Sequence, residues 1–172
     1  MTGTRAQSYA SADDAIEDLY RAHALGLVRF ALLLVGDKTT AEDVVQDAFL
    51  GLQQRWHRLA HHGNMLGYLR TAVLNGSRSV QRGRARTGRF RVPPDPTVWS
   101  AEAAAIAGES RRAILGAVAR LPRRQREVLA LKYYLGLSEL EIAGVLQVSR
   151  GTVSSTASRA LTALARELKE EQ

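Results

Sequence analysis

The sequence predicts an all-α fold of two small helical domains joined by a proline-containing linker. Apolar residues recur at helical spacing along most of the 172 residues, and no stretch alternates as a half-buried strand would. Aromatic residues make up only 6% of the chain, so the cores must be built from Leu, Val, Ile and Ala. Residues 91–100 hold three of the four prolines, which a helix interior does not tolerate. We therefore expect a first domain over residues 12–86, a linker over 87–106 and a second domain over 107–170.

Three helices are expected in the first domain. The first spans about residues 12–35, where Ser11 can cap the start and acidic residues suit the positive end of the helix dipole. The second opens at Thr40, a good N-cap, and runs to about Leu59 with an apolar stripe at i, i+3, i+4, i+7 spacing. The third starts near Asn64 and ends in an arginine-rich run.

Four helices are expected in the second domain. Residues 101–119 form the first, and Pro122 begins the next, at a position where its missing N–H costs nothing. That helix ends at residues 135–136. Ser138 and Glu141 then form an S-x-x-E capping box, in which each side chain satisfies a backbone N–H that has no partner within the helix.

The last two helices have the pattern of a helix-turn-helix. Val148 faces the core from the short turn, and Ser149 can cap the helix that follows. That helix buries the stripe Val153, Ala157, Ala160, Leu161 and Leu164. The opposite face of this helix could simply be solvated. Ser and Thr are poor helix formers, however, so their clustering on this face favours a functional role. Short polar side chains with flanking arginines can enter a major groove and bind base edges and phosphates. We therefore predict DNA binding by Arg150, Thr152, Ser154, Ser155, Ser158 and Arg159.

The distribution of charge also favours a polyanionic partner. The formal net charge is +7, and acidic residues crowd the start of the chain. No carboxylate then occurs between Asp47 and Asp95, a stretch that contains nine arginines. A basic face that was only solvated would normally be interspersed with glutamate. The basic half of the first domain is thus expected to bind nucleic acid.

Other classes of protein are disfavoured. The chain has no cysteine, which excludes disulfides and thiolate metal sites, and its first twenty residues lack the apolar region of a signal peptide. We expect a cytoplasmic protein that does not enter the membrane. His57 and His61 have a zinc-like i, i+4 spacing, but no third ligand is nearby, so no metal is expected. Because no catalytic triad, phosphate-binding loop or paired buried carboxylates are apparent, we expect neither an enzyme nor a cofactor.

Two segments of the sequence resemble a known family. LPRRQREVLALKYYLGLSELEIAGVLQVSRGTVSSTASRAL, residues 121–161, resembles region 4 of extracytoplasmic-function (ECF) sigma factors. AEDVVQDAFLGLQQRW and GYLRTAVLNGSRSVQRGR, residues 41–56 and 67–84, are similar to region 2 of the same family. The order of the segments is that of the family, and NGSRS is most similar to the sigma-E-type actinobacterial subfamily. The resemblance implies a factor that binds core RNA polymerase and directs it to promoter DNA.

The resemblance also implies a polymerase-binding surface on the second helix. Acidic and amide side chains with one leucine lie outside its apolar stripe, which suits docking on a basic helical hairpin. In the family this surface meets the clamp helices of the β′ subunit, while region 4 meets the β flap. An anti-sigma factor is a further partner that the resemblance leaves open. The residues expected to bind polymerase are Asp43, Gln46, Asp47, Leu50 and Gln54.

In the family, region 2 recognises and melts the −10 element. Melting requires cations along a single strand and a pocket for an unstacked base. The loop at residues 61–64 lies where the family captures a flipped base, Tyr68 replaces the usual tryptophan, and Asn75 matches an asparagine that contacts the strand. Tyr68 could equally be a core residue, and the loop histidines could be plain loop residues. The expected −10 set is His61, His62, Gly63, Asn64, Tyr68, Arg70, Asn75, Arg78, Arg82 and Arg84.

Region 4 of the family reads the −35 element as duplex, and here the sequence departs from the family pattern. Ser154 and Thr156, which we include in the −35 set, are neutral where the family often has Lys or Arg. Fewer phosphate or guanine contacts follow, so the −35 contact is expected to be weaker or differently specific. Gly83 likewise interrupts the arginine cluster of region 2.

The linker sets how far apart the two domains can bind. Some twenty residues reach at most about 65 Å, comparable with two turns of duplex at ~34 Å each. The domains can therefore occupy separate promoter elements only with the linker drawn out, and we expect them to fold together in the free protein. A conventional helix-turn-helix regulator that never binds polymerase would explain residues 137–164 but leave the acidic helix and the arginine run unexplained.

Overall fold

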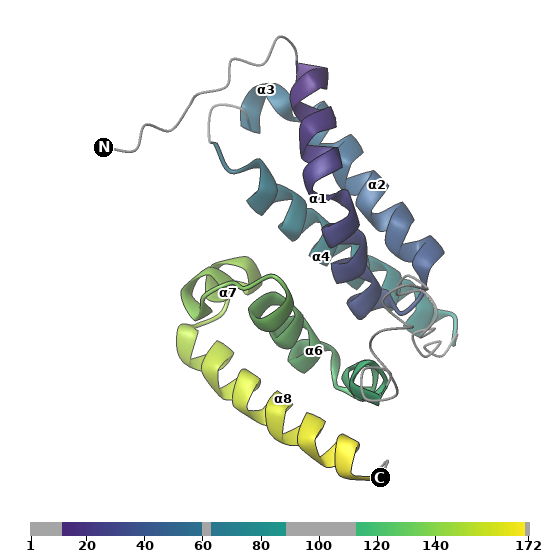
Figure 1. The fold of residues 1–172 in the computed structure, drawn as a ribbon, viewed down its shortest axis with the longest axis vertical. Coiled ribbons are helices and arrows are strands. Elements are labelled where there is room, and N and C mark those ends of the chain that lie inside the picture. Colours follow the sequence, from purple (N-terminus) through teal and green to yellow (C-terminus); the bar gives the residue numbers. More distant parts are fainter. Residues whose placement is uncertain (1–11, 60–62, 89–112, 171–172) are drawn as a thin grey trace.

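The computed structural model describes residues 12–59, 63–88 and 113–170 (Figure 1). Within these ranges the regular structure is entirely helical, which confirms the predicted all-α class. The first-domain helices are α1 (Ala12–Val35), α2 (Lys38–Gln54), α3 (Trp56–Leu59) and α4 (Met65–Arg86). In the second domain a helix over residues 113–120 is followed by α6 (Arg123–Leu129), the π-helix η3 (Ala130–Tyr134), α7 (Glu139–Leu146) and α8 (Arg150–Glu170).

Some predictions fall outside the described residues. They include the Ser11 cap, His61 and His62, the helical start at residues 101–112, and nearly all of the linker expected over 87–106. The domain bounds therefore stay a prediction.

Helices α1, α2 and α4 pack around one core, whose fully buried members include Phe30, Leu52 and Leu69. The first helix has the predicted bounds. Between α2 and α4 the Val44 side chain packs closely on Gly76, where an added Cβ would lie 3.0 Å from Val44 Cγ1. This close approach fixes how the exposed faces of α2 and α4 are presented.

The second helix differs from the prediction at both ends. Asp37, rather than Thr40, is the N-cap, because its carboxylate accepts a hydrogen bond from the Thr40 N–H at 2.9 Å. The helix ends at Gln54 instead of continuing to Leu59, and Arg55 separates it from the short α3. A local pattern cannot distinguish these ends, since two capping residues stand close together and the apolar stripe continues past the break.

The second domain follows the predicted order of helices. The capping box of Ser138 and Glu141 is present, and Ser149 accepts from the Thr152 N–H at 3.1 Å. Pro122 is the N-cap of α6. Leu161, which we expected in the buried stripe of α8, is instead 44% exposed, because the helices beneath it leave a pocket rather than filling the space.

The two domains share a continuous core. Buried residues of α6, η3 and α7 belong to the same apolar cluster as those of α1, α2 and α4. In Figure 1, α8 lies on the outer side of α6, away from the first domain. The expectation that the free domains fold together is confirmed.

Candidate functional site

The face of α2 opposite the core is an acidic and amide surface. Asp43, Gln46, Asp47, Leu50 and Gln54 are all exposed, and Leu50 is 54% exposed. The helix has this orientation because its buried residues, which include Val44, Val45 and Leu52, fall on the opposite stripe. We call the five exposed residues the α2 surface. Figure 1 shows α2 on the side of the first domain away from α7 and α8, so the second domain does not cover it.

Of the α4 residues expected to bind the −10 strand, some are exposed and others are held by protein groups. Asn75 and Arg82 are exposed and lie on one side of the helix, seven residues apart. These two residues are therefore open to a ligand. Arg78 and Arg84, by contrast, are held by protein groups.

Arg84 joins the end of α1 to the start of α2. Its guanidinium donates to Val35 O at 2.6 Å and Thr40 Oγ1 at 3.1 Å, and it pairs with Asp37. Burial alone would raise the pKa of Asp37, but the hydrogen bonds from Thr40 and Arg84 outweigh it and leave this pKa lowered. Arg84 thus has a structural role, which revises its assignment to the −10 strand.

Arg78 is bound to the second domain. Its Nε donates to Glu127 Oε1 at 2.8 Å and its Nη2 to Glu127 Oε2 at 2.7 Å, a bidentate pair. Burial alone would raise the pKa of Glu127. The hydrogen bonds and positive charge of Arg78, with smaller contributions from Arg123 and Arg124, outweigh burial and keep this pKa below its ordinary value. In this conformation Arg78 does not offer its guanidinium to DNA, contrary to the expectation from sequence.

At the start of α4, a cap and an aromatic ring lie close together. Asn64 is the N-cap, its side chain accepting from Gly67 N at 2.9 Å. Tyr68 is half-buried against the core, and Arg55 Nη1 donates to its hydroxyl at 3.4 Å. A cavity of about 490 Å³ between α2 and α4 is lined in part by Asp47, Arg55 and Tyr68. Tyr68 is therefore a core residue on one side and borders a polar groove on the other.

Gly51 leaves the room that the Tyr68 ring occupies. A Cβ at Gly51 would lie 2.7 Å from the Tyr68 hydroxyl, too close to be accepted without movement. We expect Gly51→Ala to destabilise the protein by about 1 kcal/mol, the low end for overpacking. In a Tyr68→Phe background the same change should stabilise by up to ~1 kcal/mol, because alanine favours the helix. Thermal unfolding of the four proteins measures this double-mutant cycle. If Gly51→Ala changes the stability equally in the wild type and in Tyr68→Phe, the close approach of Gly51 to the Tyr68 hydroxyl is contradicted.

The outer face of α8 has the predicted polar residues. Arg150, Thr152, Ser154, Ser155, Ser158 and Arg159 are exposed, whereas Val153 and Ala160 are fully buried. Arg159 donates to the Ser155 carbonyl at 3.2 Å, which holds its side chain along the helix. Thr156 is 7% exposed and faces the core. It cannot contact DNA in this packing, so its inclusion in the −35 set is corrected.

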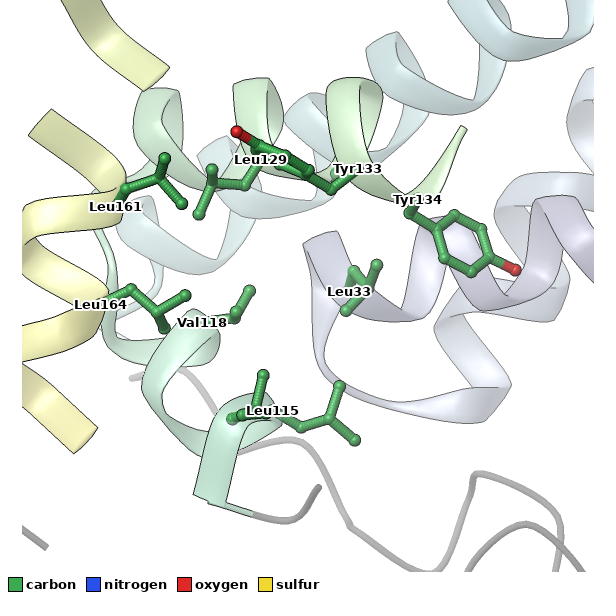
Figure 2. A pocket seen from close by; sticks show the side chains of 10 residues that line it. Leu33, Leu115, Val118, Leu129, Tyr133, Tyr134, Leu161 and Leu164 are labelled. Carbon is green, nitrogen blue, oxygen red and sulfur yellow. The ribbon is translucent and has the colours of Figure 1, made fainter. Parts of the chain in front are cut away.

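An apolar pocket of about 310 Å³, which the sequence did not lead us to expect, lies between α1, η3 and α8 (Figure 2). Leu161 and Leu164 of α8 face across it toward Leu33 of α1, with Tyr133 at its edge. Tyr133 is 60% exposed. The adjacent tyrosines in KYYLG are a sequence signal for an aromatic surface. The π-helical turn that places them at the pocket cannot be predicted from helical periodicity. We call this the apolar pocket.

No cluster of three or more His, Cys, Asp or Glu residues suited to a metal ion occurs in the described part of the chain. Among the described helices, none is both long and apolar enough to cross a bilayer.

The comparisons with known proteins agree with this geometry. Residues 19–87 match the family model for sigma-70 region 2, and residues 111–164 match sigma-70, region 4. The chain is 32% identical over 177 residues to the ECF RNA polymerase sigma factor SigL of Mycobacterium tuberculosis H37Rv, covering 96% of each chain. It is 32% identical to the RNA polymerase sigma-E factor of Streptomyces coelicolor, covering 88% of this chain and 85% of that protein.

Solved structures show the same fold. The sigma factor RpoE of Bartonella quintana, in a co-crystal with the anti-sigma factor NepR, has a TM-score of 0.71 and 25% identity. That match covers 91% of this chain and 99% of the other. CnrH in complex with the cytosolic domain of CnrY also has a TM-score of 0.71, at 24% identity, covering 93% of this chain and 91% of that one.

Two helical domains that match regions 2 and 4, in that order, define a sigma factor of the sigma-70 type. The chain belongs to the ECF family of RNA polymerase sigma factors. Within that family it is similar to the actinobacterial sigma-E factors, such as those of Streptomyces. It is thus a transcription initiation factor, of a class whose members are not enzymes but bind core polymerase and promoter DNA.

Proposed function

We propose that the α2 surface, the exposed side of α4 and the outer face of α8 divide the work of promoter-specific initiation between them. The observation that carries this assignment is that one chain presents an exposed acidic helix face and a capped helix-turn-helix with a short-chain polar face. Catalysis then belongs to the polymerase, and this chain supplies specificity. Its place of action is accordingly the cytoplasm.

The α2 surface is proposed to dock on the clamp helices of β′. Asp43 and Asp47 supply negative charge, and Leu50 supplies an apolar contact at 54% exposure. An apolar side chain at the centre of a polar surface provides the part of an interface that becomes fully buried, while the polar rim stays solvated. Charge complementarity with a basic hairpin would both orient the partner and speed its association.

The exposed side of α4 is proposed to hold the −10 strand. Asn75 and Arg82 are exposed, and Tyr68 borders the groove between α2 and α4. Gly63 and Asn64, just before the start of α4, are exposed as well. An arginine that follows the backbone and an aromatic ring for a base are the elements of single-strand binding. Arg70 is half-buried, and Arg78 joins this set only when Glu127 has moved away from it.

The outer face of α8 is proposed to read the −35 duplex in the major groove. Ser154, Ser155 and Ser158 are short enough to approach base edges, and Arg150 and Arg159 flank them for phosphates. Hydrogen bonds among Ser149, Thr152 and the first turn fix the helix start, where recognition helices contact bases.

The part of the apolar pocket that belongs to the second domain, with Tyr133, Leu161 and Leu164, is proposed to receive an apolar segment of the polymerase β flap. We expect Tyr133→Asp to lower run-off transcription about tenfold from a promoter that requires the −35 element. Losing burial of an aromatic side chain costs about 1.5–3 kcal/mol, and 1.4 kcal/mol is tenfold in affinity. Because Tyr133 is 60% exposed, the fold should be unaffected. Binding to core polymerase through the α2 surface should persist. Unchanged transcription would remove the pocket from the interface.

An anti-sigma factor is a further partner to be tested. The Bartonella quintana and CnrH structures are complexes with anti-sigma factor NepR and with CnrY. We infer that a regulator of this kind could occupy surfaces of this chain, and a screen of co-purifying proteins from its own host would identify one.

A pull-down separates the proposed function from its main alternative. A tagged chain incubated with purified core polymerase should retain the enzyme on the resin. An operator-binding regulator with the same helix-turn-helix would retain DNA but no polymerase. Retention of promoter DNA alone would therefore overturn the polymerase assignment.

A further inference from the structure

Helix α6 directs two adjacent charged side chains into the contact with the first domain. Arg126 is 3% exposed and Glu127 is 1% exposed. Charged side chains are almost never buried to this extent unless they are paired. Each has partners within the second domain and also a partner in the first domain, so both charges contribute to the contact between the domains.

Arg126 binds the end of α1. Its Nη1 donates to Leu34 O at 3.1 Å, and Gln81 of α4 donates to the same carbonyl at 2.6 Å. Helix α1 has no basic residue in its own last turn, and the last carbonyls of a helix lack partners within it. A cation from the second domain therefore completes the C-terminal end of a first-domain helix. Tyr134 adds a contact by donating from its hydroxyl to Gly26 O at 3.2 Å.

Glu127 occupies the guanidinium of Arg78. The pair is bidentate at 2.8 and 2.7 Å, and it leaves the Arg78 side chain only 18% exposed. A phosphate would need the same two N–H donors, since carboxylate and phosphate use the same face of the arginine fork. Glu127 and a DNA phosphate are therefore alternatives at Arg78.

The charge of Arg70, on α4, also affects the pKa of a carboxylate in the second domain. The pKa of Glu141 is lowered, first by hydrogen bonds from Ser138 and in addition by the positive charge of Arg70. Arg70 is half-buried, and its Nε is buried without a hydrogen-bond partner. The geometric evidence for the contact between the domains is the pair of Glu127 with Arg78, and the effect of Arg70 on the pKa of Glu141 is consistent with it.

We propose that Glu127 of the second domain acts as an internal mimic of a DNA phosphate at Arg78. In the free factor the two domains are therefore closed, and α4 binds the −10 strand fully only after they separate. This inference rests on the proposed assignment of α4 to single-stranded promoter DNA. On separation, Arg78 exchanges one bidentate anion for another, so the closed form competes with DNA rather than preventing binding outright. Core polymerase, which holds the two domains on separate promoter elements, would favour the open form.

The absence of cysteine allows the closed form to be measured directly. Ala22 on α1 and Ala165 on α8 are exposed, and cysteines at both positions can carry a donor and an acceptor dye. The labelled wild-type chain should show high energy transfer at low salt. Adding a 20-nucleotide single-stranded DNA of mixed sequence should lower the transfer, with no substitution at the contact.

Glu127→Gln tests the contact itself. It should lower energy transfer in the absence of DNA and raise the affinity for the 20-nucleotide strand about tenfold. The matched control is Glu167→Gln, which removes the pair of Glu167 with Arg120 inside the second domain and should change neither quantity. Circular dichroism confirms that both variants are folded.

The outcomes separate the inference from the proposed function. Unchanged transfer both in Glu127→Gln and on adding DNA to the wild type would overturn the closed form, while leaving promoter recognition intact. Opening of the domains without any gain in DNA affinity would overturn the competition and, with it, the assignment of α4 to the −10 strand.

Discussion

Replacing Asp47 with lysine is expected to abolish co-purification of this factor with core RNA polymerase. Asp47 is exposed at the centre of the α2 surface, one helical turn from Asp43 and from Leu50. The change reverses a charge where a basic partner is proposed to dock, and like-charge juxtaposition at an interface costs several kcal/mol. Several kcal/mol corresponds to a loss of at least about a hundredfold in affinity. Retention of core polymerase on the tagged chain provides the measurement.

Asp18→Lys is the matched control for this prediction. Asp18 is exposed on α1 in the same domain, and its replacement makes the same change of charge outside the α2 surface. Asp18→Lys should retain polymerase as the wild type does. Equal retention by Asp47→Lys and wild type, or equal loss in both variants, would contradict a role for the α2 surface.

Ser154→Glu is expected to eliminate most −35-dependent transcription. Ser154 is exposed in the first turns of α8, where a carboxylate would approach the phosphates of the duplex. Loss of one good base contact costs about 1–3 kcal/mol, and repulsion from the phosphates adds to it. Initiation from a promoter that needs its −35 element should therefore fall at least ~tenfold, as measured by run-off transcription.

The control for Ser154→Glu introduces a glutamate further along the same helix, at Ala165. Ala165 is exposed on nearly the same face, eleven residues on, which is about 16 Å along the helix axis. Ala165→Glu should transcribe as the wild type does, because it lies beyond the groove-reading turns. If both variants lose activity equally, the effect is one of net charge and not of the recognition face.

Much of the fold follows from local sequence signals. The bounds of α1 follow from an apolar stripe with acidic residues in its first turn. The capping box of Ser138 and Glu141 and the Ser149 cap place the helix-turn-helix. Exposure of the α2 surface follows equally from helical spacing, because the buried stripe dictates which side chains remain outside. These features depend on residues within a turn or two of one another.

The remaining features depend on residues distant in sequence. Nothing local indicates that Arg78 meets Glu127, 49 residues away, or that Arg84 binds the end of α1. A count of arginines gives the charge of α4 but not which guanidiniums are already occupied. Thr156 was placed on the wrong face because its type is polar, although helical spacing puts it beside Val153 and Ala157.

Run-off transcription with purified core polymerase tests the central claim most directly. Core polymerase alone starts without specificity on a library of promoter fragments. With this factor added, we expect discrete transcripts from selected fragments, and we expect them to disappear when either the −10 or the −35 element is changed. Transcripts that are unaffected by both changes, or no specific initiation from any fragment, would contradict the account.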